Sequence, residues 1–235
     1  MTGTLVYVMG PSGVGKDSLL AYARRSMSAA YAQTWTAPAP ARQGLRPVLF
    51  ARRYITRAAD AGGERHHAVT REAFQHLEDQ GAFALSWESH GLRYGIGSEV
   101  DATLAAGAVV VINGSREYLP VAAKKYPKLA PVLISARPEV LRERLQQRGR
   151  EAPEHIDERL AGAGMKLPGA MTNDLIRLDN SGPLEETGEA FARLLLRLRQ
   201  RPAPAGAAER RPFMEAPHLW RKPVSAGLQG VPAMA

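Results

Sequence analysis

The apolar positions of this chain gather into short runs that alternate with longer mixed segments. Residues 4–9 form the first run, and residues 48–55 predict a second strand. Three further runs lie at 108–112, 132–135 and 175–178. Continuous apolar runs of this kind are typical of strands that are buried on both faces of a parallel sheet.

Helical patterns separate these strands. We expect one helix at about 18–25 and another that opens near Pro138 and ends at Gly149. A last helix carries an apolar stripe at helical spacing, made of Phe191, Leu194, Leu195 and Leu198. Alternating strands and helices predict an α/β fold, with a central parallel sheet flanked by helices and joined by right-handed crossovers.

The chain divides into one domain and a tail. We expect a single domain at 1–200, with a mixed, aromatic part at about 58–100 that forms a small acceptor-binding subdomain. Residues 34–47 are rich in Ala and Pro and predict a surface insertion. Residues 201–235 are rich in Pro and Ala without any period, which predicts a disordered tail.

Composition narrows the class of protein. Hydrophobic residues make up 45% and charged residues 23% of the 235 positions, which is ordinary for a globular protein. The chain has no cysteine, so thiol and disulfide chemistry are impossible, and this fits a cytoplasmic location. Because it shows neither a signal-peptide pattern nor a run near the ~20 apolar residues of a membrane helix, we expect no membrane partner.

The net charge of +8 predicts anionic partners. Nucleotides and sugar phosphates explain this charge as well as nucleic acid does. No array of aromatic and basic residues forms a nucleic-acid platform, so we expect a small-molecule substrate and no nucleic acid. The sequence does not indicate an oligomeric state.

The strongest motif follows the first strand directly. Residues 10–16 read G-x-x-x-x-G-K and lead into the first helix, which is the context that a phosphate-binding loop requires. Its backbone N–H groups and the helix N-terminus bind polyphosphate, while Lys16 supplies a cation for the β- and γ-phosphates. We therefore expect ATP to bind at Gly10, Pro11, Ser12, Gly13, Val14, Gly15, Lys16, Asp17 and Ser18.

Asp17 departs from the general pattern of this loop. The residue after the lysine is usually Ser or Thr, whose hydroxyl binds Mg²⁺, and here Ser18 comes one position later. A carboxylate is also a good Mg²⁺ ligand, so Asp17 and Ser18 are the candidate metal ligands. Asp17 equally suits the first helical turn, where negative charge is favourable, and both interpretations stand.

Arginines gather in the segment 144–166. Arg144 and Arg148 are four residues apart and share a helix face, and Arg159 follows a break at Pro153. Taken alone, this segment reads as an exposed basic helix with ordinary salt bridges. Downstream of a phosphate loop, it predicts an Arg-rich lid in which these three arginines and Lys16 are the catalytic cations.

Candidate acceptor contacts lie nearer the centre of the chain. Arg57 follows the second predicted strand, and ligands of open α/β sheets bind at the carboxyl ends of strands. Arg93 and Tyr94 add a cation and a hydroxyl. The histidines have no common metal-site spacing.

Together these motifs resemble the guanylate kinase fold family. The resemblance covers roughly residues 3–200 and rests on 10–16, Thr56-Arg57, 90–95 and 144–160. It implies a P-loop kinase fold. It also implies that Asn180 hydrogen-bonds the adenine of ATP.

Several positions depart from guanylate kinases proper. The second acceptor-site arginine of that family is missing, and Asp60 lies near its place. The guanine-binding Glu falls at Leu85, and a hydroxyl residue falls at Ile96. Because an apolar side chain cannot accept the guanine N–H groups, the preference for guanine loses its basis.

The departures resemble one branch of the family, the ribose 1,5-bisphosphate phosphokinases of phosphonate breakdown. Segments 16–20, 53–57, 85–87 and 113–116 carry this resemblance. It implies transfer of the ATP γ-phosphate to the 1-phosphate of ribose 1,5-bisphosphate, giving 5-phosphoribosyl 1-diphosphate, with Mg²⁺ bridging the phosphates. The substrate-binding candidates then become Arg57, Arg93, Tyr94 and Arg116.

Two alternatives remain beside this interpretation. A nucleoside monophosphate kinase of relaxed base choice is compatible with Leu85. A non-catalytic guanylate kinase-like binding module is a second alternative, although such modules lack the working phosphate loop that Lys16 indicates here.

Overall fold

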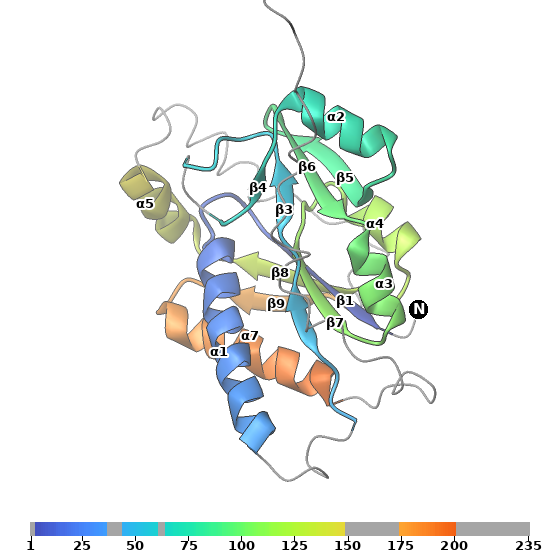
Figure 1. Ribbon diagram of the computed structural model, residues 1–235. Helices are drawn as coiled ribbons and strands as arrows, with labels where there is room; N and C mark the ends of the chain where they lie inside the picture. The colour runs from blue at the N-terminus through green and yellow to red at the C-terminus, as the bar shows by residue number, and fades with distance from the viewer. Residues whose placement is uncertain (1–2, 37–43, 61–63, 149–173, 201–235) are drawn as a thin grey trace, which may run out of the picture.

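The computed structural model describes four stretches of the chain, residues 3–36, 44–60, 64–148 and 174–200 (Figure 1). The predicted tail 201–235 lies outside the described residues, as does part of the predicted insertion 34–47. Most of the predicted lid 144–166 also lies outside them, including Arg159 and the side chain of Arg148.

Five strands form a sheet in the order β2-β7-β1-β8-β9, and every neighbouring pair runs parallel. All five positions of β7 are buried, as its continuous apolar run predicted. The predicted α/β fold with a central parallel sheet is therefore confirmed. The strands are β1 (Thr4–Met9), β2 (Val48–Phe50), β7 (Val109–Asn113), β8 (Ala130–Ser135) and β9 (Ile176–Asp179).

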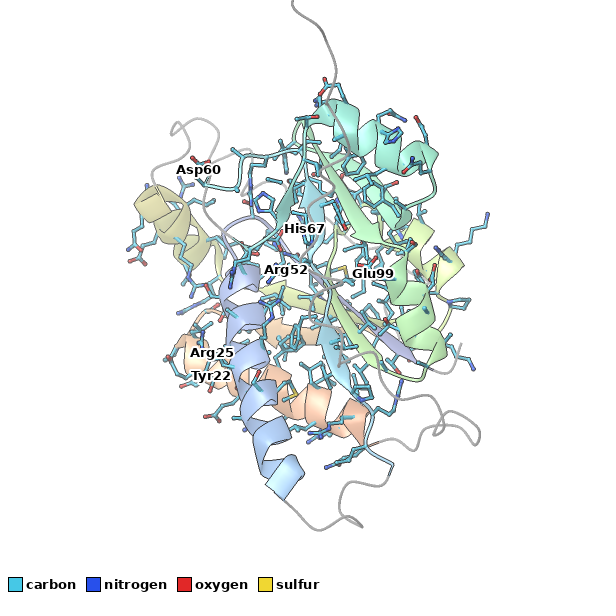
Figure 2. All side chains as sticks on the ribbon, in the orientation of Figure 1. Tyr22, Arg25, Arg52, Asp60, His67 and Glu99 are labelled. Atoms are coloured by element: carbon cyan, nitrogen blue, oxygen red, sulfur yellow. The ribbon has the colours of Figure 1, made fainter. Side chains whose placement is uncertain are left out.

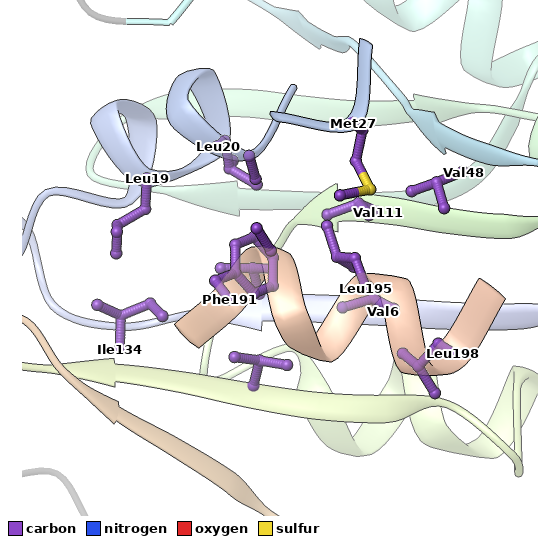
Figure 3. Packing of buried hydrophobic residues seen from close by; sticks show 14 of the residues in the cluster. Val6, Leu19, Leu20, Met27, Val48, Val111, Ile134, Phe191, Leu195 and Leu198 are labelled. Carbon is purple, nitrogen blue, oxygen red and sulfur yellow. The ribbon is translucent and has the colours of Figure 1, made fainter. Parts of the chain in front are cut away.

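Helices cover both faces of this sheet because side chains alternate along β1. Val6 and Val8 face α1 (Lys16–Thr36) and α7 (Leu184–Arg199), which pack against one another and bury Leu19, Phe191 and Leu195 (Figures 1 and 3). The intervening residues of β1 face a second cluster with side chains of α3 (Glu99–Ala105) and α4 (Leu119–Lys125). Each large apolar side chain buried in this way contributes about 1.5–3 kcal/mol.

A second, smaller sheet lies beside the first, in the order β4-β3-β6-β5. Helix α2 (Arg71–Asp79) packs on it through Phe74, whose ring centroid lies 4.6 Å from that of Phe83. Most of this sheet falls in the range 58–100. Its strands are β3 (Arg53–Ile55), β4 (His67–Ala68), β5 (Phe83–Ser89) and β6 (Leu92–Gly97).

The predicted strand 48–55 is in fact two strands that belong to different sheets. β2 pairs in parallel with β7, whereas β3 pairs antiparallel with β6. The chain changes partners just after Ala51, whose N–H still donates to the Val111 carbonyl at 3.0 Å. This change places Arg53, the first residue of β3, in the same pocket as the phosphate loop.

The first helix is longer than predicted, since α1 runs to Thr36 rather than to about residue 25. Its later turns are rich in Ala, which favours helix, and no proline occurs between Pro11 and Pro38. The helix α5 (Pro138–Arg148) begins where the sequence predicted. Within the part of the chain that the structure describes, no helix combines the length and apolar character needed to cross a membrane.

A tight hairpin joins β5 to β6. Ser89 pairs with Leu92, so the loop consists of His90 and Gly91, with φ values of 49° and 71°. Two-residue hairpin loops require this left-handed backbone, which glycine adopts at low cost. The hairpin carries Ser89 and His90 to the edge of the pocket described below.

Candidate active site

A polar pocket of about 210 Å³ opens between the phosphate loop and the second sheet. Residues from both sheets and from their connecting loops line it. They are Gly10, Pro11, Ser12, Gly13, Gly15, Lys16, Asp17, Arg53, Arg57, Trp87, Ser89, His90, Tyr94, Asn113, Gly114, Ser115, Arg116 and Glu117. Most of the predicted phosphate-binding residues therefore meet several of the predicted acceptor residues.

Lys16 lies inside the turn of the phosphate loop. Its Nζ donates to the carbonyl oxygens of Gly10 and Pro11, both at 2.8 Å. Burial lowers the pKa of Lys16 to about 8, the Asp17 carboxylate opposes this shift, and Arg53 adds to it. The cost of burying the positive charge of Lys16 is therefore only partly offset until an anion enters the loop.

Asn180 and Arg144 both approach the phosphate loop at the Val14 carbonyl. The Asn180 side-chain amide donates to the Val14 carbonyl at 2.7 Å, and the residue is only 2% exposed. An Nη1 of Arg144 lies 3.5 Å from the same carbonyl. Asn180 therefore braces the loop in this structure, and its contact with adenine stays a prediction.

The structure separates the two candidate metal ligands. Asp17 lines the pocket, and its Oδ1 accepts a hydrogen bond from Asn113 Nδ2 at 3.2 Å. Ser18 is exposed and is not among the residues that line the pocket. The described residues contain no group of three or more His, Asp or Glu side chains that could bind a metal ion. Mg²⁺ needs only one or two carboxylates beside phosphate oxygens, so Asp17 fits this ion.

Several of the candidate acceptor residues line the same pocket. Arg57, Tyr94 and Arg116 are among them, their contact with substrate stays a prediction, and burial lowers the pKa of Arg116. Arg53 joins them, and its guanidinium carbon lies 4.8 Å from the centroid of the Tyr94 ring. Arg53 was not among the predicted site residues, although the pairing of β3 with β6 places it on the same sheet face as Tyr94.

Arg93 does not reach the pocket, which corrects its predicted contact with substrate. Tyr94 faces the pocket, so the neighbouring position on β6 faces the other side of the sheet. There the Arg93 guanidinium donates to Gln75 at 2.7 Å, pairs with Glu78 and lies over the Phe74 ring. All three partners belong to α2.

Comparisons with known proteins show the family of this chain. No protein-family model matches the sequence. The ribose 1,5-bisphosphate phosphokinase PhnN of Desulfomicrobium baculatum is 50% identical over 192 residues, which are 82% of this chain and 94% of that protein. The chain belongs to the ribose 1,5-bisphosphate phosphokinase family. The enzyme of that name from Chromobacterium violaceum is 48% identical over 194 residues, which are 83% of this chain and 94% of that protein.

Membership of the phosphokinase family confirms the predicted branch and makes ATP the expected co-substrate of the phosphate loop. The solved structure of a guanylate kinase from Anaplasma phagocytophilum matches with a TM-score of 0.57 at 16% identity. The match covers 85% of this chain and 88% of that kinase. This likeness shows a shared fold and confirms the predicted guanylate kinase-like architecture.

The three positions at which the sequence departs from the guanylate kinase pattern do not line the pocket. Leu85 and Ile96 face each other across β5 and β6, and both are buried in the core. Asp60 is exposed on the loop after β3, on the side of α5 (Figure 2). None of the three lines the pocket, so they offer no groups to a guanine base there.

We expect ATP binding to take up protons near pH 8. Polyphosphate favours the ammonium form of Lys16, so binding raises a pKa that is about 8 in the free protein. Because Lys16 is already charged at pH 7, the uptake is greater at pH 8 to 8.5, and ATP affinity falls as the pH rises further. Calorimetry in buffers of different ionisation enthalpy measures this uptake.

The matched variant is Lys16→Arg, which keeps the positive charge but does not titrate in this range. It is expected to bind ATP without the proton uptake near pH 8. An uptake equal to that of the wild-type protein would assign the titration to another group.

Proposed function

We propose that this protein transfers the γ-phosphoryl group of ATP to the 1-phosphate of ribose 1,5-bisphosphate, forming 5-phosphoribosyl 1-diphosphate. The observation that carries the proposal is the pocket itself, in a chain of the phosphokinase family. It brings the phosphate loop together with Arg53, Arg57 and Arg116 in one cavity.

The reaction needs little help from a general base. The acceptor is already a phosphate oxyanion, so one of its oxygens forms the new bond to the γ-phosphorus while the bond to the β–γ bridging oxygen breaks and ADP leaves. Catalysis then rests on positioning and on neutralising charge. Lys16 meets the phosphates of ATP, and we assign Arg144, Arg148 and Arg159 to the lid around the transferring group.

The cationic end of the pocket suits an acceptor with two phosphates. Arg57 and Arg116 offer guanidinium groups that match phosphate oxygens in a two-point geometry, and the Tyr94 hydroxyl adds a donor. Trp87 stacks on Tyr94 with ring centroids 5.5 Å apart, which gives this end an apolar wall for the sugar. We leave Arg93 out of the acceptor site because it faces α2.

Asp17 is the residue that would hold Mg²⁺. Its carboxylate lies on the pocket wall one residue after Lys16, and Asn113, whose Oδ1 is buried without a hydrogen-bond partner in the described structure, keeps it in place. Bound there, the ion would neutralise negative charge on the phosphates during transfer.

Replacing Asp17 by Asn is expected to weaken the apparent Mg²⁺ affinity about tenfold, since the side chain keeps its size and an oxygen for Asn113 but loses its charge. Asp17→Ser restores part of the activity by supplying a hydroxyl ligand. The measurement is a Mg²⁺ titration of activity at saturating ATP. An unchanged titration in Asp17→Asn would leave only the stabilisation of the α1 N-terminus.

The test of the proposed function is a panel of acceptors at equal concentration, namely ribose 1,5-bisphosphate, GMP, AMP and gluconate. Product formation is followed directly for each one. Ribose 1,5-bisphosphate is expected to exceed GMP by about 10³-fold or more, because a guanine edge left unpaired is costly. Equal turnover of GMP would overturn the substrate assignment and leave a kinase of different specificity.

A further inference from the structure

Glu64 contacts Arg53 and Asn113, which both line the pocket, but does not line it itself. One carboxylate oxygen, Oε1, accepts from Nε of Arg53 and pairs with its Nη2. The other, Oε2, lies 3.3 Å from Asn113 Nδ2, which also donates to Asp17 at 3.2 Å. The chain of contacts therefore runs from the acceptor end, through Glu64, to the residue beside Lys16.

We propose that Glu64 is a positioning residue for phosphoryl transfer, which holds Arg53 toward the acceptor and ties it to the Asn113–Asp17 pair at the donor end. This inference rests on the proposed function and adds Glu64 to it, as the support of Arg53 in its contact with the acceptor.

The packing around Arg53 supports this role. An arginine side chain has about 2 kcal/mol of rotamer entropy, so a free one points in many directions. Here Glu64 forms an ion pair with the Arg53 guanidinium, and the Tyr94 ring packs against the same guanidinium. The side chains of Arg53 and Glu64 are only 13% and 14% exposed, so solvent screens their attraction less than it would at the surface.

The backbone around Glu64 is also anchored at the acceptor end. A ring nitrogen of His66, Nδ1, lies 3.0 Å from the Glu64 carbonyl, and the other, Nε2, lies 3.1 Å from the Arg57 carbonyl. The segment that carries Glu64 is thereby attached to a second acceptor arginine.

The change in kcat/KM for the acceptor on removing the Glu64 charge has one sign if Glu64 is a positioning residue and the opposite sign if it is only a nearby carboxylate. A negative group near an anion site weakens anion binding, so removal of a bystander would tighten the acceptor. Removal of a positioning carboxylate instead releases Arg53 and takes away a negative charge that offsets the effect of Arg53 and Arg116 on Lys16. The two roles therefore predict opposite changes in kcat/KM for the acceptor.

The deciding variant is Glu64→Gln, which keeps the shape and removes the charge. We expect kcat/KM for ribose 1,5-bisphosphate to fall about 30-fold, while the KM for ATP stays within about twofold. Glu64→Asp keeps the charge but moves the carboxylate by one methylene, so an intermediate loss of about fivefold is expected. If Glu64→Gln does not fold, Glu64→Asp carries the test, and wild-type kinetics in it would overturn the proposal.

A double-mutant cycle tests whether Glu64 acts through Arg53. Arg53→Gln alone is expected to lower kcat/KM for the acceptor at least as much as Glu64→Gln, and adding Glu64→Gln to it should cost less than about threefold more. Losses that multiply in the double variant would show independent roles and overturn the proposal.

The matched control is Glu78→Gln. Glu78 pairs with Arg93 on the opposite face of the same sheet, with side chains 31% and 19% exposed, so it loses a comparable ion pair away from the pocket. The melting temperature of Glu78→Gln should fall as that of Glu64→Gln does, while its kcat/KM for the acceptor stays unchanged. Equal losses of kcat/KM in both variants would show that Glu64 has only a structural role.

The wild-type assay separates this inference from the proposed function. A wild-type protein that does not phosphorylate ribose 1,5-bisphosphate would end both. An active wild-type protein with an unchanged or tighter acceptor in Glu64→Gln would end the inference alone.

Discussion

Replacing Lys16 by Ala is expected to lower kcat about 10³-fold or more while the protein keeps its fold. The ammonium group is held inside the phosphate loop by two carbonyl oxygens, so it is ready to meet the β- and γ-phosphates. Its removal leaves the charge that develops on these oxygens without its nearest cation. The measurement is ADP release in a coupled assay, together with the melting temperature.

Stability should change little in this variant. Burial opposes the charge of Lys16, as its lowered pKa indicates, so the folded state loses little when the charge is removed. The control is Lys124→Ala, which removes an exposed lysine at the end of α4. Transfer by Lys16→Ala within about tenfold of wild type, a difference of only ~1.4 kcal/mol, would contradict the assigned role.

Replacing Gly15 by Ala is expected to lower kcat/KM for ATP about 100-fold and to lower the melting temperature. Gly15 has φ +91°, which side-chain-bearing residues rarely adopt, and an added Cβ would lie 2.5 Å from Nδ2 of Asn180. That amide holds the Val14 carbonyl, so the clash displaces the brace of the phosphate loop. Kinetics at varied ATP and thermal unfolding measure the two effects.

A substitution at a second glycine separates the cost of the backbone conformation from the cost of the clash with Asn180. Gly81 has φ +68° with nothing within 4 Å of an added Cβ, so Gly81→Ala reports the cost of the backbone conformation alone, about 1–2 kcal/mol. ATP kinetics should stay unchanged in Gly81→Ala. If Gly15→Ala also left ATP kinetics unchanged, Asn180 would not support the loop in the way described.

The phosphate loop and the fold class were readable from the sequence because their signals are local. The loop is one contiguous motif whose glycines, lysine and following helix suffice to define its chemistry. The apolar run that became β7 is buried along its whole length, and such a run has few alternatives to a central parallel strand. The family followed from short motifs of the same kind, and the relatives confirm it.

Other features depended on which segments meet in space. The residues 48–55 look like one strand, but their two halves pair with β7 and β6, which lie far along the chain. Arg93 and Tyr94 are adjacent in sequence, and only the packing of α2 on one face of β6 decided which of them faces the pocket.

The role of Glu64 could not be predicted from the sequence. Nothing in its neighbours marks it, because its partners Arg53 and Asn113 are 11 and 49 residues away. A local motif specifies its own backbone geometry and chemistry, so the amino-acid sequence determined the phosphate loop. Contacts between distant segments depend on strand pairing and side-chain facing, so only the tertiary structure decided how the acceptor end is built.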